Sequence, residues 1–338
     1  MYLEELKKCY ENKKVLITGG LGFIGSNLAI RLVELNAEVT CVDNMLPRQG
    51  GNLFNVQDIR DKVKIDFSDI RNELSMRFLV KDKDFVFHLA GQVNHIESIR
   101  SPLKDLDINC TGTLVLLEAC RNNSPDVKVI FSGTRGQYGP SAKLPVDEEH
   151  PMNPKGIYAI TNMAAEKMIL VYHEVNNIKG TCLRLTNTYG PRHQMMHDEY
   201  GVVNWFIRKS LDNETINVFG DGSIVRDYLY IDDAVDALLM VGASEQAYGQ
   251  VFNIGGEISV SFIDLAKKII EIAGTGSINF TEFTKERKEL EPGDYIADIT
   301  KVKYMVGWEP KVSLEDGLRR TIQFYSIHKH KYWGGNNA

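Results

Sequence analysis

The chain has few cysteines, no excess of basic residues and no long apolar run. Its five cysteines among 338 residues form no CxxC pair and no zinc spacing, so we expect reduced thiols in a cytoplasmic protein. Lys and Arg number 39 against 45 acidic residues, which argues against sequence-blind nucleic-acid binding. No run approaches the roughly 20 apolar residues of a membrane span, and residues 1–14 lack the apolar centre of a signal peptide. We therefore expect neither nucleic acid nor membrane as a partner.

Repeats, low-complexity segments and clusters of His, Cys and carboxylate side chains are also missing, so we expect no metal site. What is present is an alternation of short buried-strand patterns with helical patterns. This order predicts parallel strands joined by crossover helices. We expect strands at 14–18, 38–43, 84–89, 127–131 and 181–185, and helices at 24–35, 111–121, 158–176 and 261–273.

The sequence pattern changes near residue 190: the expected loops become longer, and the expected helices and strands become shorter. We therefore expect a larger domain over residues 1–190 and a smaller mixed α/β domain over residues 191–338 that binds the substrate. Segments from about 220 to 255 are expected to return to the first domain.

A glycine-rich loop follows the first expected strand and opens a helix. Gly19, Gly22 and Gly25 have GxxGxxG spacing, which suits a tight turn, close approach to a pyrophosphate and close helix packing. Asp43 ends the second strand, where a carboxylate accepts from ribose hydroxyls and repels a 2′-phosphate, so we expect NAD rather than NADP. The fold class is therefore α/β, a Rossmann-type doubly wound parallel sheet. The neighbouring residues expected at the cofactor are Phe23, Ile24 and Asn44.

Several motifs in order resemble the extended short-chain dehydrogenase/reductase family, in particular its NAD-dependent nucleotide-sugar epimerases and dehydratases. The segments that carry the resemblance are TGGLGFIG (18–25), HLAGQ (88–92), YGP (189–191), GDGSIVRDYLYIDD (220–233) and GWEP (307–310). The resemblance implies a nucleoside diphosphate sugar as substrate, and a homodimer through helices near 102–120 and 158–176. It also implies cofactor contacts from Asp69, Ile70, Leu89, Ala90 and Gly91.

The resemblance further implies a catalytic hydroxyl at a strand end and a Tyr and Lys four residues apart on one helix. Thr134 and Tyr158 match the first two positions, but Asn162 stands where the Lys is expected. A Tyr has a pKa of about 10, and Asn supplies no positive charge to lower it. Three interpretations are open: a slow enzyme, an engineered substitution, or chemistry that has drifted. Lys155 is a candidate for compensation.

The residues after Thr134 bear on the reaction. Family 4,6-dehydratases carry an Asp–Glu pair there, whereas this chain has Arg135 and Gly136, which argues against dehydration. Epimerisation by transient oxidation at sugar C4 is the simplest chemistry that remains. The alternatives are a net 4-dehydrogenase, then a 4,6-dehydratase, or a catalytically weak NAD-binding paralogue.

The sugar nucleotide is expected to lie against residues of both domains. Arg226 suits the pyrophosphate, or else forms a salt bridge to Asp227, Asp232 or Asp233. Glu291 would repel a diphosphate, so either Arg287 substitutes or that end binds differently. A further alternative is that Glu291 accepts from ribose hydroxyls or from a guanine amine. The histidines of the 193–197 loop either belong to a flap or contact the sugar. Asn217 and Val218 match a short strand of the family whose backbone reads the edge of the base. The full expected substrate set is Gln92, Thr134, Arg135, Asn187, Val203, Phe206, Asn217, Val218, Arg226 and Glu291.

Overall fold

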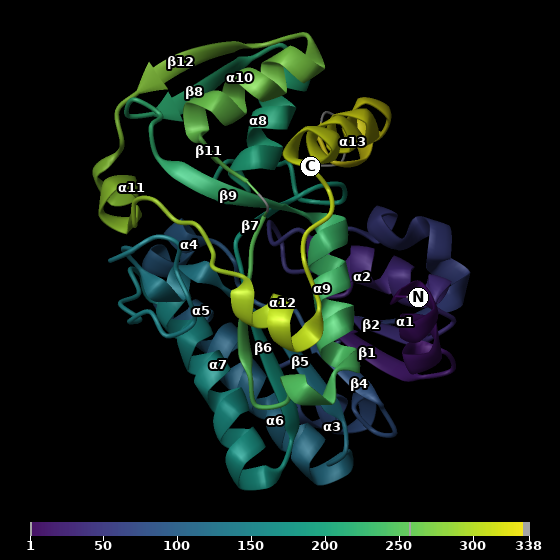
Figure 1. Ribbon diagram of the computed structural model, residues 1–338. Helices are drawn as coiled ribbons and strands as arrows, with labels where there is room; N and C mark the ends of the chain where they lie inside the picture. The colour runs from purple at the N-terminus through teal and green to yellow at the C-terminus, as the bar shows by residue number, and fades with distance from the viewer. Residues whose placement is uncertain (1, 257, 334–338) are drawn as a thin grey trace.

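A seven-stranded parallel sheet forms the centre of the larger part of the molecule (Figure 1). The computed structural model describes residues 2–256 and 258–333. The strand order is β10-β6-β5-β4-β1-β2-β3. Because the order changes direction between β1 and β4, a crevice opens at the carboxyl ends of these two strands. The strands are β1 Lys14–Thr18, β2 Glu38–Val42, β3 Val63–Asp66, β4 Phe85–His88, β5 Lys128–Thr134, β6 Lys179–Leu185 and β10 Val251–Ile254.

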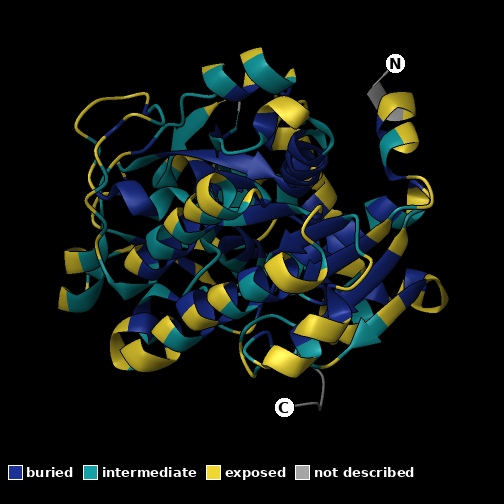
Figure 2. Ribbon diagram, turned by 90° about the horizontal axis from the view of Figure 1, so that it is seen from below, coloured by how far each residue is buried: buried dark blue, intermediate teal, exposed yellow. Residues whose placement is uncertain are grey.

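Helices cover both faces of this sheet because alternate strand residues point to opposite sides. Val15 and Ile17 pack with α1, α2 and α9, whereas Leu16 packs with α3 and α6. Figure 2 shows the result, dark blue strands between helices whose outer faces are yellow. The covering helices are α1 Tyr2–Tyr10, α2 Phe23–Glu34, α9 Ile231–Ala243, α3 Glu73–Leu79, α6 Gly112–Asn123 and α7 Ile157–Asn176.

The charged start of the chain folds as α1, an element that the sequence analysis did not assign. Its last residue, Tyr10, is fully buried, and its ring lies 4.7 Å from that of Phe85. The Tyr10 hydroxyl donates to the carbonyl of Leu239 on α9 at 2.8 Å. This aromatic anchor ties the N-terminal helix to the core.

A smaller part carries a three-stranded sheet, β11-β9-β7, and a two-stranded parallel sheet, β12-β8. From β9 the chain runs through α9 back to β10, which pairs with β6 in the large sheet. The strands here are β7 Asn187–Tyr189, β8 Thr215–Phe219, β9 Val225–Tyr230, β11 Ser259–Ser261 and β12 Ser277–Thr281. The remaining helices are α4 His95–Arg100, α5 Pro102–Leu106, α8 Val202–Leu211, α10 Phe262–Ala273, α11 Lys285–Leu290, α12 Thr300–Val306 and α13 Leu314–His328.

The predicted Rossmann-type parallel sheet is confirmed, and the expected elements differ from the observed ones mainly at their ends. The helix expected at 261–273 begins after Ser261, whose hydroxyl accepts from the Asp264 N–H at 3.1 Å. Within the described part of the chain, no helix combines the length and the apolar character needed to cross a bilayer.

Candidate active site

The loop between β1 and α2 brings the start of a helix to the carboxyl end of the sheet. Gly19 has φ +71°, and its N–H donates to the carbonyl of Val42 at 2.7 Å. A Cβ on Gly25 would overlap the carbonyl oxygen of Gly19, so only glycine lets α2 start this close to the turn. Gly22 and Phe23 line the cavity beside the free N–H groups of the first helical turn. This cradle suits the phosphates of a dinucleotide.

Two carboxylates follow neighbouring strands at the edge of the same cavity. Asp43 accepts from the N–H of Leu21 at 3.1 Å and of Met45 at 2.9 Å, and its desolvation raises the pKa of the carboxyl. Hydrogen bonds from the Arg71 guanidinium lower the pKa of Asp69 to about 2. Asp69 is therefore ionised at neutral pH, and both carboxylates are available to hydroxyl or amine donors of a bound nucleotide.

The turn after β4 is held open toward the cavity by polar side chains beneath it. The N–H groups of Leu89 and Ala90 donate to the Thr18 hydroxyl at 3.2 and 3.1 Å. Asn109 lies in a π-helical turn ahead of α6. Its side-chain Oδ1 accepts from the Gln92 backbone N–H at 2.8 Å. These contacts fix the backbone of the turn, which lines the cavity.

The three expected catalytic positions meet at the centre of the cavity. Thr134 ends β5, and its hydroxyl is a hydrogen-bond partner of the Tyr158 side chain on α7. Desolvation raises the pKa of Tyr158 to about 12, against a weaker opposing effect from the Arg135 charge. The Asn162 side chain turns back and donates to the Tyr158 carbonyl at 2.9 Å. The site thus has the hydroxyl pair and, one helical turn after Tyr158, the neutral amide of Asn162.

His95, which the sequence analysis did not select, packs against the expected catalytic Tyr158. The two rings meet edge to face with their centroids 4.5 Å apart. Desolvation, with a further contribution from the Arg135 charge, lowers the pKa of His95 to about 4, so its imidazole is neutral at pH 7. Its only sequence signal is its place just after the strand-end turn.

Arg226 lies at the far end of the cavity, with only 1% of its side chain exposed. It pairs with the Glu291 carboxylate. The alternative of a salt bridge to Asp227, Asp232 or Asp233 is therefore wrong. Neighbouring strand residues point to opposite faces, so Asp227 is directed away from the Arg226 side chain.

A stacked pair of phenylalanines, which the sequence analysis missed, also lines the cavity. The rings of Phe219 and Phe283 stack with centroids 5.4 Å apart, and the Arg287 guanidinium lies 4.8 Å from the Phe219 ring centroid. Arg287 also pairs with Asp198 at 2.7 Å, so its charge is already partnered. The flat faces suit stacking with a nucleotide base.

Val218 is the one predicted site residue that does not line the cavity. Strand β8 alternates, so Asn217 faces outward and lines the cavity whereas Val218 is fully buried in the core. Its side chain therefore does not face the cavity, and a contact of its backbone with the base edge stays a prediction.

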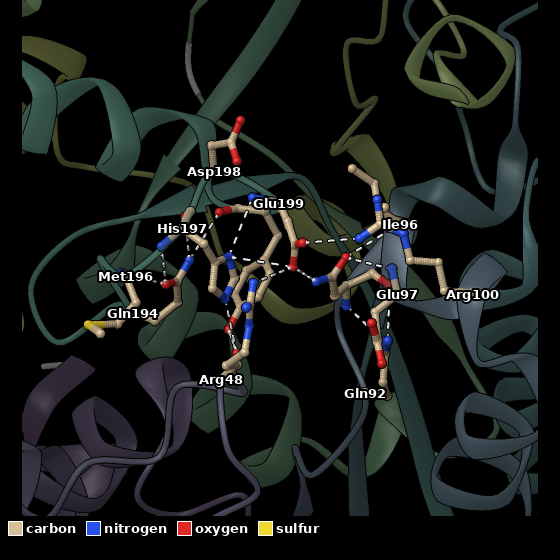
Figure 3. Close-up of polar contacts among 12 residues, drawn as sticks. Arg48, Gln92, Ile96, Glu97, Arg100, Gln194, Met196, His197, Asp198 and Glu199 are labelled. Carbon is tan, nitrogen blue, oxygen red and sulfur yellow. Dashed lines mark hydrogen bonds and ion pairs between the residues drawn. The ribbon is translucent and has the colours of Figure 1, made fainter. Parts of the chain in front are cut away.

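The 191–201 loop crosses the mouth of the cavity and is tied to two other loops (Figure 3). Glu199 accepts from the Asn94 amide at 2.5 Å and from the Arg48 guanidinium at 3.3 Å. The His197 ring contacts the Arg48 carbonyl with its Nε2 at 3.1 Å. Loop segments that follow β2, β4 and β7 are thus joined above the crevice.

These parts surround one cavity of about 870 Å³. Its wall brings together residues from the glycine loop, the strand ends and the smaller part. The predicted residues that line it are Gly19, Gly22, Phe23, Ile24, Gly25, Asp43, Asn44, Asp69, Ile70, Leu89, Ala90, Gly91, Gln92, Thr134, Arg135, Tyr158, Asn162, Asn187, Val203, Phe206, Asn217, Arg226 and Glu291. Across residues 2–256 and 258–333, no group of three or more His, Cys, Asp or Glu side chains could hold a metal ion.

A doubly wound sheet with a glycine loop at a helix start and acidic strand ends in one cavity is typical of dinucleotide-binding enzymes. Residues 15–255 match the NAD dependent epimerase/dehydratase family, and the chain belongs to this family. The family's cofactor is NAD.

Relatives with this fold include nucleotide-sugar 4-epimerases. The chain is 34% identical to a putative UDP-glucose 4-epimerase of Methanocaldococcus jannaschii, over 92% of this chain and 97% of the relative. It is 32% identical to the UDP-glucose 4-epimerase of Mycolicibacterium smegmatis, over 92% and 98%. The crystal structure of the Thermotoga maritima UDP-glucose 4-epimerase with UDP-glucose is 35% identical, with a TM-score of 0.86 over 94% of this chain and 99% of that one.

Proposed function

We propose that the protein interconverts epimers of a nucleoside diphosphate sugar at C4 through transient oxidation with NAD. The observation that carries the proposal is the single cavity in which Thr134 and Tyr158 lie between the glycine loop and the diphosphate end marked by Arg226. UDP sugars are the first candidates because the relatives described above are named UDP-glucose 4-epimerases.

The residues at the glycine-loop end fit NAD. The close packing at Gly25 leaves the helix start open to a pyrophosphate, and Asp43 offers its carboxylate to ribose hydroxyls. A 2′-phosphate beside Asp43 would be repelled, which favours NAD over NADP. When bound, NAD supplies the hydride acceptor at its nicotinamide ring.

The chain's own residues handle the proton. The Tyr158 oxygen takes the proton of the C4 hydroxyl. It returns the proton after the 4-keto sugar has rotated in the cavity. The hydrogen bond between the Thr134 hydroxyl and Tyr158 supports a role for Thr134 in holding the reacting oxygen. With Asn162 in place of a cation, Tyr158 keeps a pKa of about 12, so only a small fraction is phenolate at pH 7. We therefore expect slow turnover at neutral pH.

Other outcomes of the same oxidation are less well supported. Dehydration needs acid–base groups next to Thr134, and Arg135 and Gly136 stand there. A net 4-dehydrogenase shares the first half-reaction, and a catalytically weak paralogue would bind NAD without conversion.

One experiment separates these outcomes. The NAD-loaded protein is mixed with UDP-glucose, UDP-galactose and other nucleoside diphosphate sugars, with absorbance read at 340 nm and products identified by NMR. Interconversion without lasting absorbance supports the epimerase. Stoichiometric NADH with a keto sugar indicates the dehydrogenase, a 4-keto-6-deoxy product indicates the dehydratase, and no change with every sugar indicates the weak paralogue.

We also propose that the protein is a homodimer formed by the α5–α6 and α7 helices. Large apolar side chains are exposed on these neighbouring helices. In a monomer they would be in contact with water, whereas a dimer interface would bury them. Two copies of such a face make a self-complementary four-helix interface. The exposed residues are Leu103, Leu106, Leu114, Ile160, Val171 and Val175.

A further inference from the structure

The basic side chains in the cavity wall differ in whether an acid accompanies them. Arg226 pairs with Glu291, Arg287 with Asp198, and Lys209 with Glu214. The other two, Arg135 and Lys155, form no ion pair with any residue of the described part of the chain. Lys155 is exposed to solvent, whereas Arg135 is half-buried. Arg135 is therefore the cation inside the cavity that lacks an acidic partner.

The Arg135 side chain is held in place although its charge is unpaired. Its Nε donates to the side-chain Oδ1 of Asn187 at 3.2 Å, and its guanidinium carbon lies 5.1 Å from the Tyr295 ring centroid. No described residue accepts a hydrogen bond from its two terminal nitrogens. Two parallel N–H donors on a fixed planar group match the two oxygens of a carboxylate.

Arg135 lies between the reacting end of the cavity and the diphosphate end. It follows Thr134, the hydrogen-bond partner of Tyr158. Its charge also lowers the pKa of Arg226, which is itself lowered mainly by desolvation. On a pyranose held with C4 at Tyr158, the C5 substituent projects from the next carbon. A group attached at C5 can therefore reach Arg135.

We propose that Arg135 binds a carboxylate at C6 of the sugar, so that the substrate is a nucleoside diphosphate hexuronate. This inference rests on the proposed C4 chemistry and specifies its substrate class. A neutral hydroxymethyl group at the same place would leave the guanidinium without a counter-ion in a partly desolvated site, whereas a carboxylate completes a bidentate pair. The β-phosphate is the other possible source of an anion, and the test distinguishes the two.

The test compares binding of UDP-glucuronate and UDP-glucose to the NAD-loaded protein by calorimetry, alongside turnover. Hydrogen bonds between charged groups are roughly twice as strong as neutral ones, so we expect UDP-glucuronate to bind at least about tenfold more tightly. Arg135→Gln should remove this preference, because it should weaken binding of UDP-glucuronate at least about tenfold more than binding of UDP-glucose. Arg135→Lys should keep part of it. Arg77→Gln, which removes the same charge from the exposed surface of α3, should keep all of it.

Two results would overturn the assignment. If Arg135→Gln weakens both sugars by the same factor, the guanidinium contacts the diphosphate instead. If the wild-type protein shows no preference, or the variant retains it, Arg135 does not bind a sugar carboxylate. Binding is measured separately from conversion, so tight, Arg135-dependent binding of UDP-glucuronate without epimerisation would contradict the proposed reaction and not this site.

Discussion

Asn162 stands one helical turn after Tyr158, with its amide turned back onto the carbonyl of that residue. The amide brings no charge to the phenol, and desolvation sets the Tyr158 pKa at about 12. A general base works in its deprotonated form, so the rate should rise with pH up to the pKa of Tyr158. Any cation placed near the phenol should therefore shift the rising limb of the profile to lower pH.

Asn162→Lys places an ammonium at this position. A nearby positive charge lowers a pKa by about 1–3 units, so we expect kcat at pH 7 to rise about tenfold or more. The measurement is kcat against pH for the wild-type protein, Asn162→Lys and the neutral control Asn162→Gln. A lysine variant with an unchanged profile would mean that position 162 does not act on Tyr158.

At the element scale, the 191–201 loop depends on Glu199 for its tie to the loops after β2 and β4. The same loop lines the cavity, and loops over a site commonly open before a bound ligand leaves. Glu199→Gln removes the charge shared with Arg48 and weakens the bond to Asn94. We expect NAD to dissociate about threefold to tenfold faster, because the substitution removes about 1 kcal/mol of the free energy that holds the loop over the site.

The dissociation rate can be followed by displacing labelled NAD with an excess of unlabelled cofactor. Glu286→Gln is the matched control. Glu199 and Glu286 each form an ion pair with Arg100, but Glu286 lies on α11 and forms no ion pair with the described loop after β2. Equal release rates in the wild-type protein and Glu199→Gln would show that the tie does not hold the cofactor.

The elements also show what sequence patterns can predict. Spacing alone located the glycine loop, because one short segment contains the turn, the phosphate cradle and the helix start. It does not show which way Val218 faces, because a shift of one residue along a strand exchanges the cavity side for the core side. It also missed His95 and Glu199, whose contacts come from segments far apart in the chain. Such contacts have no local periodicity to reveal them.

At the scale of the whole molecule, the exposed apolar residues of α5, α6 and α7 need an explanation that the single chain does not provide. Leu103 is 79% exposed and Val175 is 70% exposed, on helices that lie side by side. The proposed dimer would bury both. A charge placed in such an interface is desolvated in both copies at once, because a two-fold contact repeats every substitution.

The double variant Leu103→Glu, Val175→Glu should therefore be monomeric at concentrations where the wild-type protein is dimeric. We expect the dimer dissociation constant to rise about 100-fold or more, as measured by sedimentation equilibrium or by light scattering after gel filtration. Tyr304→Glu is the matched control, because Tyr304 is 90% exposed on α12, outside the proposed interface, and should leave the dimer intact. A double variant that stays dimeric would place the interface elsewhere, and a monomeric wild-type protein would contradict the dimer. The monomer should keep its bound NAD, because the glycine loop and both carboxylates of the cofactor end belong to one chain.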